Sequence, residues 1–231
     1  MHKAKLKQNH DRQVCFNTLL LAFCAGYCDT VTYTSGHATF SAHITGNFVL
    51  FAFDLLHTAG HLPIPGARMP IHPAGLPAWP RLLSLPVFVA SIFTARRLTR
   101  RRLILLEAIL LIAAGSLATL TQNYSLTMLT VFAMGLQNAF STLFPTSVLG
   151  PTTIMTTNVT QTVLNLSAFL QSKRTDTTAK NALVSNLIPI TGFTTGCLLG
   201  ALLATYTGMP ALLLPGILLL LRQIRFESFF P

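Results

Sequence analysis

Acidic residues are scarce in this chain. Its 231 residues include six Asp and Glu against sixteen Lys and Arg, and charged residues make up only 10% of the total. Soluble domains carry about 25% charged residues. This deficit, together with a mean hydropathy of +0.56, argues for a chain embedded in lipid. The net charge of +10 does not indicate nucleic-acid binding, because the basic residues form short clusters between apolar runs, as they do in membrane proteins.

The signatures of common enzymes are also missing. The chain has no Gly-rich phosphate loop, no His-Glu-x-x-His run and no Gly-x-Ser-x-Gly elbow. Its four cysteines lie in or beside apolar segments without companion ligands at zinc spacing, so we expect them to be packing residues. We therefore expect no enzymatic activity, no metal and no cofactor.

Eight apolar segments are present, and not all of them can span a bilayer directly. They cover residues 14–33, 44–58, 82–95, 103–121, 126–144, 154–170, 182–204 and 209–221. A spanning helix needs about 20 residues. Segments 44–58 and 154–170 are short or rich in Thr, Asn and Gln, and they are the doubtful pair. A basic stretch precedes the first segment, which we expect to remain as an uncleaved membrane helix.

The placement of positive charge favours one topology. Both topologies are compared with the N-terminus in the cytoplasm. If segments 44–58 and 154–170 each enter and leave the membrane on the same side, fourteen of the sixteen Lys and Arg residues are cytoplasmic. If all eight segments span, only eleven are cytoplasmic. We predict an all-α integral membrane protein with about six full transmembrane helices and two short re-entrant or broken segments. Each half, 14–120 and 126–221, then crosses three times, so the halves are inverted repeats. The eight-span alternative gives parallel repeats. The Pro-rich segment 59–80 is expected to be a loop.

A polar motif occurs twice within these apolar surroundings. The first copy runs from GYCD (26–29) to HITGN (43–47), and the second from GLQN (135–138) to MTTN (155–158). Polar side chains are costly in hydrocarbon unless they have partners. Two such sets at matching places in two halves predict one site built from both.

The candidate site takes its residues from both copies of the motif. They are Asp29, His43, Thr45, Gly46, Asn47, Gln137, Asn138, Thr156 and Asn158. An ionisable residue inside an apolar segment is a functional hypothesis, so Asp29 is expected to bind a cation or carry a proton. The alternative is an acid hydrogen-bonded to neighbouring threonines, or one near the outer interface.

The other candidates also have two interpretations each. The Thr and Asn residues of 45–47 and 156–158 either cap a helix or present a helix start to a substrate. His43 can relay protons or face water at the interface. Gln137 and Asn138 can contact a solute or hold helices together. We expect Glu107 to pair with Arg101 or Arg102, or to reach the interface.

Three strings resemble the signature of the YoaK-like bacterial inner-membrane proteins. They are AGYCD (25–29), FSAHITGN (40–47) and AMGLQNA (133–139). The resemblance implies a multispanning protein of the bacterial inner membrane and no particular reaction, because that family is one of unknown function. Two departures occur, since Thr157 replaces the glycine of the second triplet and 90–93 replaces an expected Gly-rich stretch.

The leading functional hypothesis is a secondary transporter or permease for a small polar solute or ion. In it, both Thr-x-Asn turns line a central site, and Asp29 is the coupling or binding acid. The alternatives are a passive channel of the same architecture, and a membrane scaffold or regulator in which the polar motifs only lock helices together. The expected partners are the lipid bilayer and an unknown small solute or ion, without nucleic acid. Homo-oligomerisation stays open.

Overall fold

The chain is built from α-helices. A computed structural model describes residues 2–58, 79–121, 123–172 and 174–226, and within these ranges it forms helices and no strands. They are α1 (His2–Ser35), α2 (Ile44–Thr58), α3 (Trp79–Ala95), α4 (Arg100–Leu117), α5 (Tyr124–Leu143), η1 (Pro145–Ser147), α6 (Met155–Gln171), α7 (Thr177–Thr207), η2 (Met209–Leu212) and α8 (Leu213–Phe226). The predicted all-helical class is confirmed. Most of the Pro-rich segment 59–80 lies outside the described residues.

Local sequence explains where several helices begin. α1 starts at His2, twelve residues before the apolar segment, because the basic stretch has neither Gly nor Pro and contains good helix formers. α4 begins after Thr99, whose side chain accepts a hydrogen bond from the backbone N–H of Arg102. α7 begins after Asp176, whose carboxylate accepts from two backbone N–H groups of the first turn.

Three helices are long and apolar enough to cross a bilayer. They are His10–Ser35, Tyr124–Leu143 and Thr177–Thr207. Shorter apolar helices cover Ile44–Leu55, Arg81–Ala95 and Met209–Ile224. These helices characterise the chain as a membrane protein. The number of full spans is not set by length and composition alone, so six spans stay a prediction.

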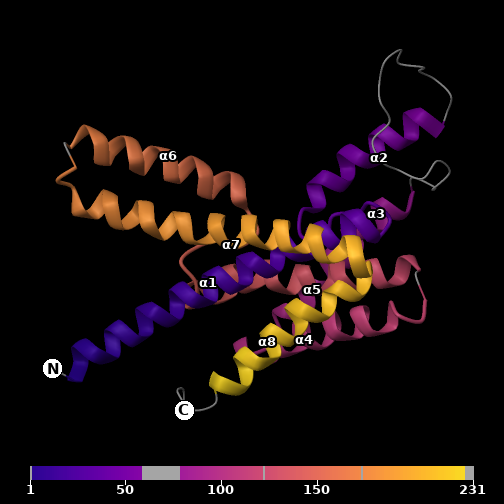
Figure 1. The fold of residues 1–231 in the computed structure, drawn as a ribbon, viewed down its shortest axis with the longest axis horizontal. Coiled ribbons are helices and arrows are strands. Elements are labelled where there is room, and N and C mark those ends of the chain that lie inside the picture. Colours follow the sequence, from indigo (N-terminus) through magenta and orange to yellow (C-terminus); the bar gives the residue numbers. More distant parts are fainter. Residues whose placement is uncertain (1, 59–78, 122, 173, 227–231) are drawn as a thin grey trace.

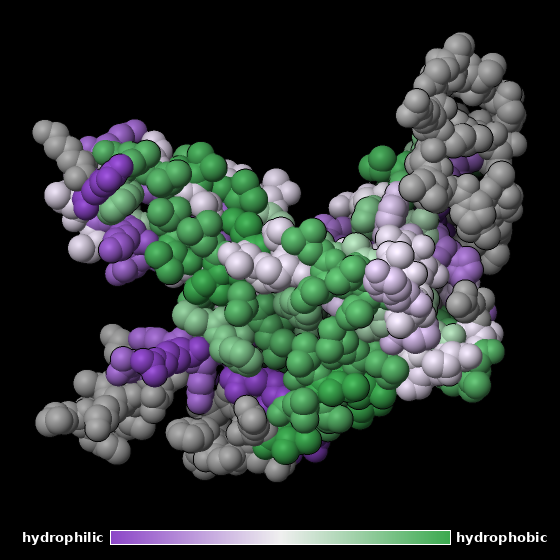
Figure 2. All heavy atoms as spheres, viewed as in Figure 1, coloured by the Kyte–Doolittle hydropathy of each residue, from purple (hydrophilic) through white to green (hydrophobic). Residues whose placement is uncertain are grey.

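Many large apolar side chains are exposed, while several polar side chains are buried together with the apolar core. Leu198, Val163 and Phe93 are exposed, whereas Thr127 and Gln137 are fully buried. Figure 2 shows hydrophobic residues spread over the central face of the molecule. Soluble monomers seldom expose contiguous apolar surface of this kind, and a surface of this composition suits contact with lipid.

Helices from the two ends of the sequence are interleaved. α1 packs along α7, α3 packs against α5, and α4 packs against α8 (Figure 1). α2 lies beside α3, and α6 lies beside α7. Each of α1 and α5 therefore packs on a helix that belongs to the other half of the chain.

Two motif glycines allow these close crossings. A methyl group on Gly26 of α1 would lie 2.2 Å from the carbonyl oxygen of Phe193 in α7. A methyl group on Gly135 of α5 would lie 1.8 Å from the hydroxyl oxygen of Ser91 in α3. Such separations are far below van der Waals contact, so only glycine lets the backbones approach to this degree.

The main helices alternate in direction. In Figure 1, α1, α4 and α7 run one way, and α3, α5 and α8 run the other way. α2 and α6 extend from the body toward opposite ends. After α1 the chain turns back through His37 and Ala38, whose φ angles of 62° and 49° are left-handed. This turn brings residues 41–43 back alongside α1.

Basic residues gather at the end of the molecule where both termini lie. The turn after α3 with the start of α4 (96–102) and the turn before α7 lie at this end in Figure 1. Arg222 lies there too, near the C-terminal end of α8, beside Arg100 and Asn17 in one cavity lining. The start of α3, the helix that contains Arg81, lies toward the other end.

Candidate functional site

Asp29 is buried against the turn that follows its own helix. Its side chain is 4% exposed. One carboxylate oxygen accepts hydrogen bonds from the backbone N–H of Ala42 at 2.5 Å and from the hydroxyl of Ser41 at 3.3 Å. The other oxygen pairs with Nδ1 of His43. The hydroxyls of nearby threonines such as Thr32 bond instead to carbonyl groups of α1, so the turn and not the helix supplies the partners of Asp29.

His43 connects this cluster to the second half of the chain. Its side chain is 35% exposed, and it lies close to the backbone of Thr153 in addition to its pairing with Asp29. Its ring also meets the ring of Phe193 edge-on, with 5.4 Å between centroids. Thr153 lies in the segment that leads into α6 (148–154), and His43 itself ends the segment that leads into α2 (36–43). We call these two segments the entrance segments of α6 and α2, and the imidazole of His43 connects them.

Asn47 holds the first entrance segment in place. Its Oδ1 accepts a hydrogen bond from the backbone N–H of Phe40 at 2.8 Å, and its Nδ2 donates to the carbonyl of Phe40, also at 2.8 Å. Nδ2 also donates to the hydroxyl of Ser84 in α3 at 3.1 Å. Gly46 lies on the Phe40 ring, where a methyl group would come within 2.8 Å. Asn47 therefore fixes the turn and does not cap α2 in the ordinary manner.

The second copy of the motif contains a similar contact. Nδ2 of Asn158 donates to the carbonyl of Pro151 at 2.9 Å. Asn158 and Asn47 each stand at the fourth residue of a helix, and each reaches a carbonyl seven residues earlier. Gln137 is fully buried, and its Nε2 donates to the carbonyl of Leu21 at 2.8 Å and to the hydroxyl of Thr152 at 3.5 Å.

The structure brings some candidate residues together and leaves others apart. Asp29 and His43 form one cluster, and Gln137 contacts the entrance segment of α6. The side chains of Thr45 and Thr156 are exposed and take no part in either set of contacts. Each precedes a buried Asn by two residues, which is about 200° around a helix, so it faces the other way. Asn138 is half-buried.

Three residues of this region are absent from the sequence prediction. Ser41 bonds to Asp29, Thr153 lies close to His43, and Ser84 bonds to Asn47. Ser41 and Thr153 are polar residues that precede α2 and α6, so the polarity of the entrance segments was a usable signal. Ser84 lies in an apolar helix far along the chain, and no local pattern points to it.

The prediction that Glu107 pairs with Arg101 or Arg102 is wrong. Glu107 is fully buried, and neither carboxylate oxygen has a hydrogen-bond partner among the described residues. The spacing explains the error, because residues five or six apart on a helix do not share a face. Glu107 shares its face with the buried Leu103 and Leu111. Asp54 of α2 pairs with Arg81 of α3.

These observations describe an all-helical chain that has helices apolar and long enough to cross a membrane, and buried polar contacts between its N-terminal and C-terminal parts. The model of the family described as "Protein of unknown function (DUF1275)" matches residues 18–223, and the chain belongs to that family. Its membership agrees with the inferred membrane character, while the narrower likeness to YoaK-like proteins stays a resemblance. Neither the curated proteins nor the solved structures contain a match.

Proposed function

We propose that this protein is a secondary transporter, or permease, for a small polar solute or ion. The observation that carries the proposal is the chain of contacts from Asp29 through His43 to Thr153, which joins both halves at a buried acid. Ionisable residues inside membrane segments are costly and typically mark ion or substrate pathways. A buried acid beside a half-exposed histidine is suited to exchange a proton or cation with water.

Matching features in the two halves support a pair of inverted repeats. Asn47 and Asn158 make the same contact across seven residues. Gly26 and Gly135 each lie at a crossing with the third α-helix of the other half, α7 and α3 respectively. α1 and α5 run in opposite directions in Figure 1, as inverted repeats require. We propose that α2 and α6 are re-entrant segments and that the other six α-helices span.

The gathering of basic residues supports an orientation. Arg and Lys are retained preferentially on the cytoplasmic side. We propose that the end carrying the termini and the 96–102 cluster faces the cytoplasm of a bacterium, in the inner membrane. The turn between α4 and α5 then faces outward, and the cluster around Asp29 lies between the two surfaces.

Uptake by purified protein in liposomes tests the proposal. The measurement is the initial rate of uptake for a panel of amino acids, small organic acids, sugars and monovalent cations, with and without an imposed proton gradient. We expect saturable uptake of at least one solute. Asp29→Asn is expected to lower its rate about tenfold or more, because the ionisable group of the site is removed.

A matched control separates the site from general charge effects. Asp11→Asn makes the same chemical change at an exposed residue of α1 and is expected to keep the wild-type rate. Uptake that Asp29→Asn leaves unchanged would remove Asp29 from the mechanism, and the absence of flux across the whole panel would contradict the transporter.

One observation favours a second candidate, a membrane scaffold or regulator. The amide groups of Asn47 and Asn158 bond to backbone carbonyls, which is what residues that only hold helices together would do. In this case no solute on the panel is taken up, and Asn47→Ala and Asn158→Ala lower thermal stability without altering any ligand binding.

A further inference from the structure

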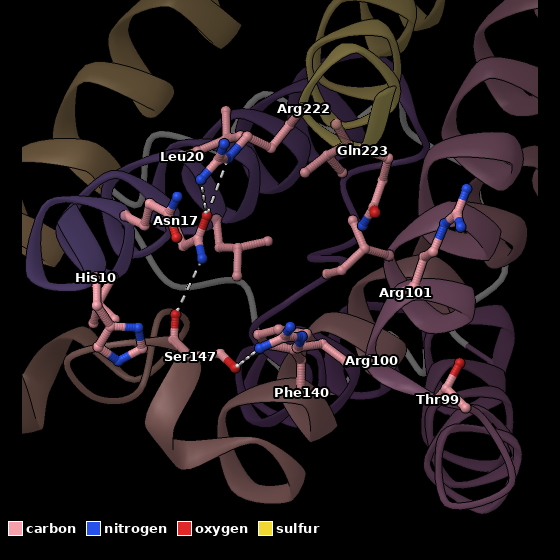
Figure 3. Close-up of a pocket in the computed structure, with 15 residues that line it drawn as sticks. His10, Asn17, Leu20, Thr99, Arg100, Arg101, Phe140, Ser147, Arg222 and Gln223 are labelled. Atoms are coloured by element: carbon pink, nitrogen blue, oxygen red, sulfur yellow. Dashed lines mark hydrogen bonds between the residues drawn. The ribbon is translucent and has the colours of Figure 1, made fainter. Parts of the chain in front are cut away.

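A cavity of about 360 Å³ opens among helices at the end of the molecule where the termini lie. Its lining comes from α1, α4, α5, α8 and η1, as Figure 3 shows. It is separate from the cluster around Asp29, since neither Asp29 nor His43 belongs to the lining. A volume of this size falls within the range of small-molecule sites.

The wall of the cavity is strongly cationic. Arg100 and Arg101 come from the start of α4, and Arg222 comes from α8 on the opposite side. His10 of α1 also lines it, and none of the fifteen lining residues that the structure describes is acidic. Guanidinium groups bind carboxylates and phosphates through paired hydrogen bonds, so this wall presents groups that recognise an anion.

A chain of hydrogen bonds holds two of these guanidinium groups around the opening. Nε and Nη2 of Arg222 donate to Oδ1 of Asn17 at 3.1 and 2.9 Å. Nδ2 of Asn17 donates to the carbonyl of Ser147 at 3.3 Å, and Nη1 of Arg100 donates to the hydroxyl of Ser147 at 3.2 Å. The arginines are thus positioned on both sides of the cavity before any ligand arrives (Figure 3), which reduces the entropic cost of binding.

Two further features indicate the chemistry of a ligand. α4 begins at Arg100 with Thr99 as its N-cap, so the positive end of an 18-residue helix lies at the same opening. Apolar side chains also line the cavity, among them Leu21, Ile104 and Leu219, all buried. A cationic opening joined to an apolar lining fits a ligand that has an anionic head and an apolar chain or ring.

We propose that this cavity binds an amphiphilic anion, with a phosphate or carboxylate head between Arg100, Arg101 and Arg222 and an apolar chain or ring against Leu21, Ile104 and Leu219. This site goes beyond the proposed transport function and does not use its residues. The anionic head can belong to a phospholipid of the adjacent leaflet, since basic pockets between membrane helices bind lipid headgroups, or to a soluble amphiphile from the cytoplasm.

Two binding measurements on the purified full-length chain distinguish these sources. Native mass spectrometry in a neutral detergent compares retention of phosphatidylglycerol with that of phosphatidylcholine. Thermal shift compares octyl phosphate with octyl glucoside, which has the same chain and no charge. Preference for phosphatidylglycerol alone identifies a lipid headgroup. A larger stabilisation by octyl phosphate than by octyl glucoside identifies a soluble anion as a ligand.

Paired substitutions assign the binding to the cavity. Arg100→Gln with Arg222→Gln is expected to weaken binding of the preferred anion about tenfold per arginine, as the loss of a charge-assisted hydrogen bond does. Arg96→Gln with Arg97→Gln removes the same charge from exposed positions on the adjacent turn and is expected to bind like the wild type. Arg101→Gln, at an exposed residue, provides a milder test if the first double variant fails to fold.

The proposal is overturned by either of two results. One is a lack of preference for the anionic ligand over its uncharged or zwitterionic counterpart in both measurements. The other is an equal loss of affinity in the cavity variants and the Arg96 and Arg97 control, which would show that net charge attracts the anion without a built site.

Discussion

The amide of Asn47 fixes the turn between α1 and α2. It bonds to both backbone groups of Phe40 and to the hydroxyl of Ser84, and the side chain is almost entirely buried. Removing it leaves the backbone N–H and C=O of Phe40, both part-buried, without these partners, and a fully buried polar group left unpaired costs about 1–3 kcal/mol. The same turn carries the partners of Asp29, so the position of the acid depends on Asn47.

We expect Asn47→Ala to destabilise the protein by about 1–3 kcal/mol, measured as a lower midpoint of thermal unfolding in one detergent. Asn158→Ala should cost less, because Asn158 makes a single bond to a backbone carbonyl. Thr45→Ala is the control, because Thr45 lies on the exposed side of α2, the helix that contains Asn47. It should leave the midpoint unchanged. A larger loss for Asn158→Ala than for Asn47→Ala would contradict this account.

Glu107 presents the opposite situation, a buried carboxyl group without a partner among the described residues. Burying an ionisable group without compensation is unfavourable. We expect Glu107→Gln to keep or raise the thermal unfolding midpoint, because the amide has nearly the same shape and no charge. A midpoint lowered by many degrees would show that the carboxyl group makes a stabilising contact in the membrane.

Single residues were predictable where their chemistry alone marks them. An acid inside an apolar run, such as Asp29, stands out in the sequence, and so do the two buried Asn residues. The outward direction of Thr45 and Thr156 follows from helical geometry, which a motif does not contain. The contact between His43 and Thr153 joins residues more than a hundred positions apart, and no local pattern encodes it.

At the scale of elements, hydropathy located each α-helix of the described residues, and glycine decides how two pairs of them meet. Segment 44–58 coincides with α2, and the other predicted segments overlap their helices. Which helices pack against each other was not predictable, because a glycine indicates a close helix contact but does not identify the partner helix. The packing of α1 on α7 and of α5 on α3, each in the other half of the chain, is visible only in the folded chain.

We expect Gly26→Ala to be more destabilising than Gly135→Ala. The new methyl group at Gly26 meets the backbone carbonyl of Phe193, which can move only with its helix, and overpacking of this kind costs about 1–3 kcal/mol. At Gly135 it meets the hydroxyl of Ser91, which can rotate away. Thermal unfolding of the purified variants measures the difference. Adding Ser91→Ala should restore part of the stability lost in Gly135→Ala, because the Cβ of residue 91 and the Phe88 ring stay 3.0 and 3.1 Å from the new methyl group; no recovery at all would count against a clash with the hydroxyl.

At the scale of the whole molecule, topology distinguishes six spans from eight. With a cytoplasmic N-terminus, six spans leave the turn after α3 inside and the turn after α4 outside, and eight spans give the reverse. In a variant without native cysteines, we expect an impermeant maleimide to label Leu120→Cys in intact cells. Thr99→Cys should react only after permeabilisation. Thr99 and Leu120 are both exposed, so a difference in labelling does not arise from burial within the protein. Labelling of Thr99→Cys in intact cells, and of Leu120→Cys only after permeabilisation, would support eight spans.

Because helices of the first half pack on helices of the second half, the chain can complete its fold only after the second half has been synthesised. The ribosome releases α1 and α3 before α5 and α7 exist, although α1 packs on α7 and α3 packs on α5. A nascent chain that stops after Leu120 therefore lacks the surfaces that cover two of its own helices. The same two halves made as separate polypeptides contain every partner, and assembly in the bilayer then depends on their meeting and not on their covalent link.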